Sequence, residues 1–354
     1  MDKRPDTAHS VSPDSGTHWS APGAWRAAPG VFRIPLPLPM DGLKAINVYA
    51  IETPEGLTLI DGGWAIPVAR ELLESSLASV GYGIGDIKRF LVTHVHRDHY
   101  TQAVTLRKEV GAHVSLGWGD KGTLDLINDP DLETNPHVEL YEAAGAPQIA
   151  QAWRGFGESD RPDLSLWEYP DTWLEGDRVL SVGERTIDAV HTPGHTQGHY
   201  VFADTPGGLL FSGDHVLPTI TPSIGVEPVQ ADLALGDFMR SLARVRELPD
   251  LAVLPAHGPV APSSYDRVDE LLDHHEARLA LSLEAVRGGA ATPYEVAGEL
   301  TWTRHEHPMA TLDVFNAGMA TLETQAHLDL LVARGQATLA WSDGVRRYAF
   351  AQRD

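Results

Sequence analysis

The amino-acid sequence predicts a layered α/β fold, and three observations carry this prediction. Short β-rich segments alternate with amphipathic helical segments along most of the chain. Several β-rich segments end in a cluster of polar side chains, as strands do where their loops hold ligands in layered α/β proteins. With 354 residues, the chain can bury a large core and form one large domain and a small one.

The first half of the chain begins with residues 1–24, which are rich in Ser, Pro, Asp and Gly and are expected to form a disordered tail. Apolar and β-branched runs bounded by turn residues predict strands at 30–36, 46–52, 56–63, 87–96 and 112–117. Helices are predicted from Ile66 to Val80 and from about His99 to Val110. Residues 118–165 carry little β signal and predict a helical insertion.

The second half predicts two hairpins, over 178–195 and 199–216, then a helix at 231–247 and a buried strand at 251–258. A long helix over 263–288 carries an apolar stripe with helical spacing. A short helix capped by Thr292, a longer helix closed by Gly335 and a hairpin turning at "SDG" then follow. This order of helices and hairpin predicts a winged-helix-like module, so we expect a catalytic domain over 25–262 and a C-terminal part over 263–354.

Composition excludes several kinds of site. The chain has no cysteine, so any metal must be held by His, Asp or Glu, a donor set that suits zinc, iron or manganese. A net charge of −22 makes nucleic acid an unfavourable partner. The N-terminus lacks the apolar core of a signal peptide, and no apolar run reaches the ~18–20 residues of a membrane span. The expectation is therefore a cytoplasmic protein without a membrane partner.

The stretch "FLVTHVHRDHY" at 90–100 is the main candidate for a metal site. His94 and His96 are two residues apart, so in an extended segment both point to the same side and can reach one metal. Asp98 and His99 follow at the start of the predicted helix, where the turn directs them to a second, adjacent metal. Further ligands must come from other strand ends, where the sequence offers His195, Asp214 and His257.

The order "LIDGG", "THVHRDH", "HTPGH", "SGD" and "PAHG" over roughly residues 30–260 resembles the metallo-β-lactamase superfamily of metal-dependent hydrolases. The resemblance implies an αββα sandwich with a dinuclear site at one edge. By position, His94, His96 and His195 would bind the first metal, and Asp98, His99 and His257 the second. Asp214 would bridge them, and Asp61 matches the family's aspartate that orients ligands. The implied cofactor is two zinc ions, with iron or manganese as alternatives.

The same resemblance implies the chemistry. Two cations about 3.5–4 Å apart lower the pKa of a bridging water, and the resulting hydroxide attacks the substrate. Asp98 and Asp214 are thus expected to serve catalysis as well as metal binding. Tyr100, His199 and His215 lie beside these motifs, outside the metal set, and are candidates for lining the substrate pocket.

Three functions stay open at this stage. The first is hydrolysis of a small ester, thioester or lactone, and the partner is then a small molecule. The second is an endoribonuclease, because the C-terminal part is similar to the winged-helix extension of the lactamase-beta-2 branch and carries Arg346 and Arg347. The third is an iron-dependent oxidoreductase similar to persulfide dioxygenases. The sequence leaves the oligomeric state open, a homodimer included.

Overall fold

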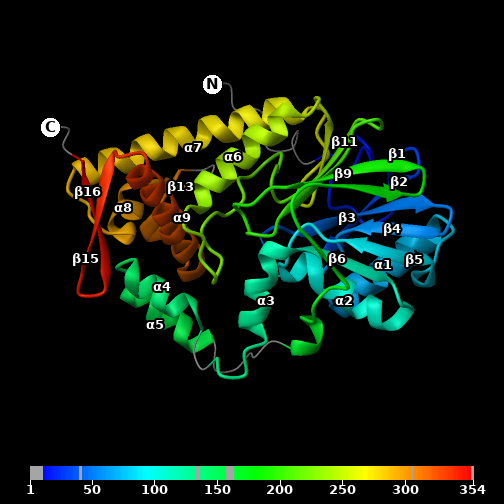
Figure 1. Ribbon diagram of the computed structural model, residues 1–354, viewed down its shortest axis with the longest axis horizontal. Coiled ribbons are helices and arrows are strands. Elements are labelled where there is room, and N and C mark those ends of the chain that lie inside the picture. Colours follow the sequence, from blue (N-terminus) through cyan, green and yellow to red (C-terminus); the bar gives the residue numbers. More distant parts are fainter. Residues whose placement is uncertain (1–10, 40–41, 133–134, 157–162, 304–305, 352–354) are drawn as a thin grey trace. The chain divides into compact units, whose positions relative to one another are not determined.

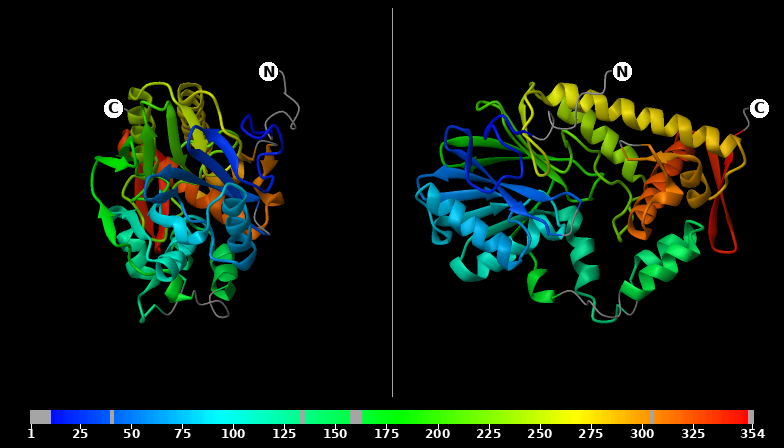
Figure 2. Two further views of the ribbon diagram at one scale, coloured as in Figure 1. Left: turned by 90° about the vertical axis from the view of Figure 1, so that its right-hand side faces the viewer. Right: turned by 180° about the vertical axis from the view of Figure 1, so that it is seen from behind.

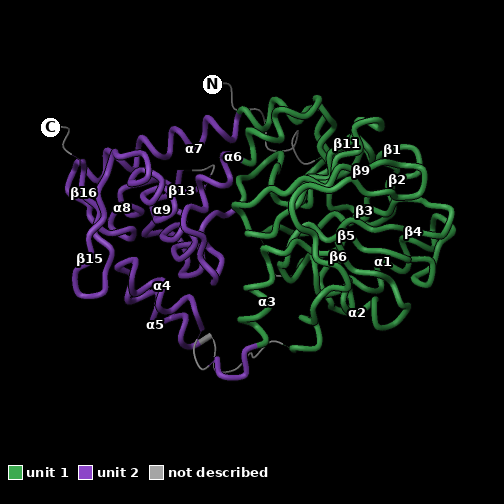
Figure 3. Tube along the Cα trace, viewed as in Figure 1, with its two compact units in different colours: residues 1–128, 163–222, 241–269 green, residues 129–162, 223–240, 270–354 purple. Residues whose placement is uncertain are grey.

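The computed structural model describes residues 11–39, 42–132, 135–156, 163–303 and 306–351, and divides them into two compact units (Figure 3). The first unit comprises residues 1–128, 163–222 and 241–269, and the second comprises 129–162, 223–240 and 270–354. The chain therefore passes between the units several times. No described helix combines the length and apolar composition needed to cross a membrane.

The first unit contains a sheet whose described strands follow the order β1-β2-β3-β4-β5-β6-β7 (Figure 1). The pairs from β1 to β4 are antiparallel, and those from β4 to β7 are parallel. The strands are β1 Trp25–Ala28, β2 Val31–Pro37, β3 Ala45–Thr53, β4 Gly56–Ile60, β5 Ile87–Leu91, β6 His113–Gly117 and β7 Thr172–Leu174. Because β4, β5 and β6 are parallel, their carboxyl ends meet at one edge of the sheet.

A second sheet in the same unit has the order β12-β11-β10-β9-β8. Its strands are β8 Arg178–Val182, β9 Arg185–His191, β10 Tyr200–Asp204, β11 Leu209–Gly213 and β12 Ala252–Pro255. The pair β11–β12 is parallel and the other pairs are antiparallel, so the polar residues that follow β11 and β12 also lie at one edge.

Two apolar layers hold the first unit together. Tyr49, Leu91, Phe202 and Phe211 belong to a buried cluster formed by residues of both sheets. A larger cluster on the other face of the first sheet includes residues of the helices α1 (Pro67–Ser79) and α2 (Arg97–Val110), which lie along that face in Figure 2. The stacked sheets with helices outside confirm the predicted αββα sandwich.

The remaining helices are α3 Lys121–Ile127, α4 His137–Ala143, α5 Pro147–Phe156, α6 Ala234–Glu247, α7 Ser264–Arg287, α8 Pro293–Glu299 and α9 Val314–Ala333. Short 3-10 turns cover Ile84–Asp86, Trp118–Asp120, Leu164–Leu166 and Met309–Thr311. In the second unit α4 and α5 share a core with α8 and α9, to which Tyr141, Ile149, Ala297 and Leu322 contribute. The described residues of 118–165 thus include the helices α3, α4 and α5, and the assignment of this segment as an insertion of a domain over 25–262 stays a prediction.

The C-terminal elements largely follow the sequence pattern. Thr292 caps α8 by accepting from the backbone N–H of Glu295 at 3.2 Å, and the Glu295 carboxylate accepts from the N–H of Thr292 at 3.0 Å. The predicted hairpin is β15 Ala337–Ser342 with β16 Val345–Phe350, which turns through Asp343 and Gly344, both with positive φ. A small pair of strands, β13 Thr301–Trp302 and β14 His307–Pro308, precedes α9. The winged-helix assignment stays a prediction.

Two local features differ from the expectation. Strand β5 ends at Leu91, so His94 and His96 lie in a loop and not in a strand that continues to residue 96. Residues 11–24 were expected to belong to a disordered tail, but Ser12 and Trp19 are buried and Asp14 forms an ion pair with Arg33. Residues 1–10 lie outside the described part of the chain.

We predict that Phe202→Ala lowers the free energy of unfolding by about 3–5 kcal/mol, because the ring is fully buried between the sheets and its loss leaves a cavity. Urea denaturation monitored by circular dichroism measures this change. Val179→Ala in β8 is the control, since that side chain is 71% exposed and should change stability by less than about 0.5 kcal/mol. Equal effects of the two substitutions would contradict the assigned core.

Candidate metal centre

The seven predicted ligand residues follow strands of the two sheets, five of them in loops and two at the start of a helix. Strand β5 leads into the loop with His94 and His96, and Asp98 and His99 form the first turn of α2. His195 lies between β9 and β10, while the other two residues, Asp214 and His257, follow β11 and β12. The structure brings these residues together into three overlapping groups of side chains, and within each group the donor atoms lie within 4.8 Å of one another. The groups are His94, His96 and His195; Asp98, His99 and His257; and, sharing one histidine with each of these, His94, His99 and Asp214.

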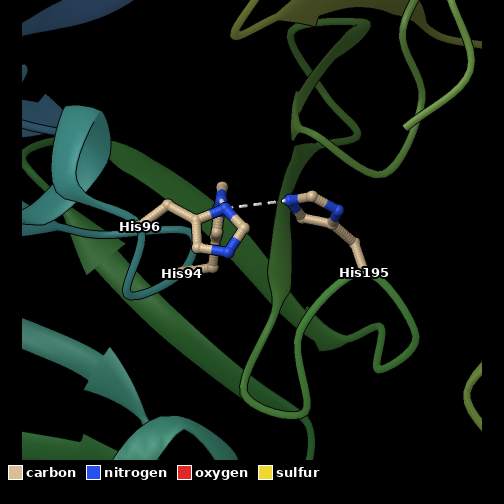
Figure 4. Close-up of side chains that lie close together, drawn as sticks. All are labelled: His94, His96 and His195. Carbon is tan, nitrogen blue, oxygen red and sulfur yellow. Dashed lines mark hydrogen bonds between the residues drawn. The ribbon is translucent and has the colours of Figure 1, made fainter. Parts of the chain in front are cut away.

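The first group consists of His94, His96 and His195 (Figure 4). His94 Nε2 lies 3.0 Å from His96 Nδ1, and His195 Nε2 lies 3.2 Å from the same His96 nitrogen. Three imidazole nitrogens thus converge, two of them from the loop after β5 and one from the loop between β9 and β10. Figure 4 shows a nitrogen of His195 directed toward a nitrogen of His96, and the planes of the two rings are 87° apart.

The second group consists of Asp98, His99 and His257. Asp98 Oδ2 lies 3.4 Å from His257 Nε2 and 3.7 Å from His99 Nε2. His99 and His257 are buried, and Asp98 is partly exposed. A carboxylate and two imidazoles at this spacing are a suitable donor set for a divalent cation.

The carboxylate of Asp214 lies between the two groups. Its Oδ2 is 3.6 Å from His195 Nε2 and 4.0 Å from His94 Nε2. Its Oδ1 is 3.4 Å from His257 Nε2 and 3.8 Å from His99 Nε2. Each oxygen therefore faces a different group.

Hydrogen bonds on the far side of the rings fix their orientation. His99 Nδ1 lies 2.9 Å from Asp61 Oδ2, and His257 Nδ1 donates to the carbonyl of Ala45 at 2.8 Å. Thr93 Oγ1 lies 3.0 Å from His94 Nδ1, and its backbone N–H donates to Asp61 at 2.7 Å. These contacts leave the Nε2 atoms directed into the site. Asp61, directly after β4, has a positive φ of 61°.

The buried polar atoms at the centre fit a metal. His99 Nε2 and Asp214 Oδ1 are buried, and neither makes a hydrogen bond to any residue that the structure describes. Burial without a hydrogen bond is costly, so these atoms are suited to a ligand that supplies positive charge. The donors are nitrogen and oxygen alone, which suits zinc, iron or manganese.

The pKa values of the clustered Asp and His side chains also support a cation site. Burial by itself raises the pKa of Asp98, but His99 and His257 outweigh it and hold the pKa below its usual range. Burial lowers the pKa of His257, but the charges of Asp214 and Asp98 raise it to about 10. Ionised carboxylates and a proton on His257 therefore face each other, and a divalent cation held by these residues would take the place of that proton.

Asp120 supports the site, although no sequence pattern pointed to it. It is buried, its Oδ2 accepts from the N–H of Val95 at 2.9 Å, and its Oδ1 accepts from the N–H of Gly198 at 2.7 Å. Val95 lies between His94 and His96, and Gly198 lies three residues after His195. Asp120 thus ties together the two loops that carry the first group.

The three residues considered for the substrate pocket are all buried. The Tyr100 hydroxyl donates to the carbonyl of Glu168 at 2.5 Å. His199 Nδ1 lies 2.9 Å from Thr192 Oγ1, while its Nε2 accepts from the N–H of Asp214 at 3.2 Å. His215 packs with its ring 5.9 Å from the His199 ring. His199 therefore supports the backbone of Asp214, and the pocket assignment of all three residues stays a prediction.

The arginines considered for RNA binding lie on β16 in the second unit. Arg346 Nη1 is 3.1 Å from Asp329 Oδ1, and its guanidinium lies over the Trp341 ring at 5.0 Å. Arg347 is exposed. The charge of Arg346 is thus partly balanced by a carboxylate of its own unit.

The chain is similar in sequence to known metal-dependent hydrolases. Residues 41–257 match the metallo-beta-lactamase superfamily. The chain is 24% identical over 330 residues to the probable metallo-hydrolase YqjP of Bacillus subtilis, covering 87% of this chain and 93% of that protein. It is 26% identical over 237 residues to an atrochrysone carboxyl ACP thioesterase of Aspergillus fumigatus, covering 65% of this chain and 42% of that protein.

A similar structure is a metallo-beta-lactamase family protein from Thermus thermophilus. Its TM-score is 0.75 at 26% identity, over 92% of this chain and all of that chain (100%). A beta-lactamase domain protein from Burkholderia ambifaria also has a TM-score of 0.75, at 25% identity, and covers 96% of this chain and 99% of that one. Both matches extend over nearly the whole chain.

We predict that Asp120→Asn lowers the free energy of unfolding of the metal-free protein by about 1–3 kcal/mol, because one buried N–H, of Val95 or of Gly198, loses its acceptor. Urea denaturation in the presence of a chelator measures the change. Asp125→Asn is the control, since Asp125 is an exposed aspartate that pairs with Lys121. A stability equal to that of the control would contradict the assigned link.

Proposed function

Because the chain belongs to the metallo-beta-lactamase superfamily and is a metal-dependent hydrolase, we propose that it is a dinuclear enzyme acting on a small ester, thioester or lactone. The observation that carries this proposal is the carboxylate of Asp214. Its two oxygens face different groups of histidines, so this side chain could be shared by two cations. A mononuclear site would need neither the second group nor the shared carboxylate.

The proposed ligands follow from this division. His94, His96 and His195 would hold one cation, and Asp98, His99 and His257 the other, with Asp214 shared. When bound, two such cations supply an activated water and polarise the oxygen of the group under attack. The protein's own contribution is to hold seven side chains in place and to keep their outer atoms hydrogen-bonded.

The protein groups have distinct tasks in this proposal. Asp61 holds His99 through its Nδ1, and the carbonyl of Ala45 does the same for His257. Both rings therefore offer Nε2 to the site. The carboxylates of Asp98 and Asp214 converge near His257 Nε2, each at 3.4 Å. Both carboxylates could accept a hydrogen bond from a water molecule in the site and orient it.

A thioester is the substrate class to test first. Similar proteins include thioesterases that act on an acyl carrier protein, such as the atrochrysone carboxyl ACP thioesterases of two fungi. A thioester carbonyl is open to attack by an activated water without a protein nucleophile, and this chain has no cysteine to serve as one. The endoribonuclease and iron-dependent oxidoreductase alternatives gain no support from a specific contact.

We predict that the protein hydrolyses a small acyl substrate only when metal is bound, and that Asp214→Asn lowers kcat/KM by more than about 100-fold, because the shared ligand is lost. A panel of esters, thioesters and lactones measured with zinc, manganese and iron forms gives the rates. Elemental analysis of the native protein gives the number and kind of metal ions per chain.

Asp204→Asn is the matched control, because Asp204 is a buried aspartate at the opposite end of the β10–β11 hairpin, where it pairs with Arg185. This variant should keep the metals and the activity. Absence of turnover across the panel by the metal-loaded enzyme would contradict the hydrolase proposal. A single iron ion per chain as the dominant native form would favour the oxidoreductase alternative instead.

A further inference from the structure

The segment that precedes the first sheet contacts a fully buried arginine. The Arg33 guanidinium, on β2, donates from Nε to Asp14 Oδ2 at 2.6 Å and from Nη2 to Asp14 Oδ1 at 2.9 Å. Its Nη1 donates to the carbonyl of Trp19 at 2.5 Å. The Arg33 side chain is 0% exposed, and that of Asp14 is 3% exposed. Both residues precede the region, 41–257, that matches the superfamily.

Arg33 also contacts Asn47 on the neighbouring strand β3. Its Nη1 donates to Asn47 Oδ1 at 3.0 Å, which fixes the direction of that amide, because an arginine cannot accept a hydrogen bond. Asn47 Nδ2 then donates to the carbonyls of Pro255 at 3.0 Å and Gly258 at 2.9 Å. Both hydrogens of one amide nitrogen are used on a single loop.

The loop held in this way carries His257. Pro255 and Gly258 stand two residues before and one residue after that histidine. The Tyr49 hydroxyl also donates to the carbonyl of Pro255, at 2.9 Å. A continuous path of hydrogen bonds therefore runs from Asp14 through Arg33 and Asn47 to the backbone on both sides of His257.

We propose that residues 12–19 position His257 through this path, and that Asp14, Arg33 and Asn47 are positioning residues for the cation held by Asp98, His99 and His257. This inference rests on the proposed function, because it assigns these residues to one of its two cations. A buried guanidinium keeps its place only when paired, so Asp14 stabilises the conformation in which Arg33 directs Asn47.

We expect the path to affect the binding affinity for one cation and to leave the affinity for the other unchanged. The loops of His94, His96 and His195 are held by Asp120, which has no part in the path. His257 belongs to the second group alone. Weakening the path should therefore lower the affinity of the second group more than that of the first.

The experiment compares the full-length wild-type chain with Asn47→Leu and Asp14→Asn. Metal-free protein is dialysed against buffered free zinc, and zinc per chain is measured by elemental analysis. We expect two ions in the wild type and one in Asn47→Leu, with affinity for the second ion lowered about 10–100-fold and the first unchanged. Asp14→Asn should give a smaller loss of the same ion.

Asp204→Asn is again the control, because it too removes the charge of a buried aspartate that pairs with an arginine. It should bind two zinc ions with wild-type affinity. Two ions bound equally well by Asn47→Leu would overturn the inference, and so would an equal loss of both ions.

A second measurement does not depend on metal binding. In the metal-free protein, the imidazole resonances of His257 should shift in Asn47→Leu and Asp14→Asn, while those of His94 and His195 keep their wild-type positions. Unchanged His257 resonances in both variants would overturn the path even if the wild type bound fewer than two ions. That low count would by itself contradict only the dinuclear proposal, so the two failures are distinguishable.

Discussion

The position of one carboxylate, that of Asp214, is the constraint on which the rest of the site depends. It can face histidines of both groups only if the ends of β11 and β12 meet the ends of β4 and β5. Backbone geometry enforces the close approach. Gly213, directly before Asp214, has φ of 51°, and a Cβ there would lie 2.7 Å from His199 Nε2 and 2.8 Å from Thr93 Cβ. No side chain larger than hydrogen fits without displacing both neighbours.

The loops that carry the candidate ligands are held in similar ways. Asp61, Asp120 and Asn47 are buried polar residues outside the set of candidate ligands. The side chain of each forms a hydrogen bond with the backbone of a segment that carries candidate ligands. Because a buried polar group without a partner is costly, each such contact favours a single loop conformation. The site is therefore arranged by polar side chains from several different elements, while the apolar layers fix the distance between the sheets.

The elements that the sequence predicted well are those with strong local signals. Apolar runs ending in polar clusters located β4, β5, β11 and β12, and the hairpin turn at Asp343 and Gly344 followed from its residues alone. Elements with weak local signals were not predicted. Strand β7 has only 3 residues and depends on pairing with β6. Residues 11–24 have a tail-like composition, but the ion pair between Asp14 and Arg33 and the burial of Trp19 hold them against the rest of the first unit. In both cases long-range contacts outweigh local preference.

The sequence by itself determined which donor atoms the candidate metal site can offer. Seven His and Asp residues follow predicted strands in a specific order, two of them at the start of a predicted helix, and the absence of cysteine leaves only nitrogen and oxygen donors. Only the tertiary structure decided which ring nitrogen each histidine offers, which oxygen of Asp214 faces which group, and which residues hold the loops. The physical reason is that these choices depend on hydrogen bonds between distant segments. Asn47 and Pro255, which are 208 positions apart, meet only when the two sheets stack.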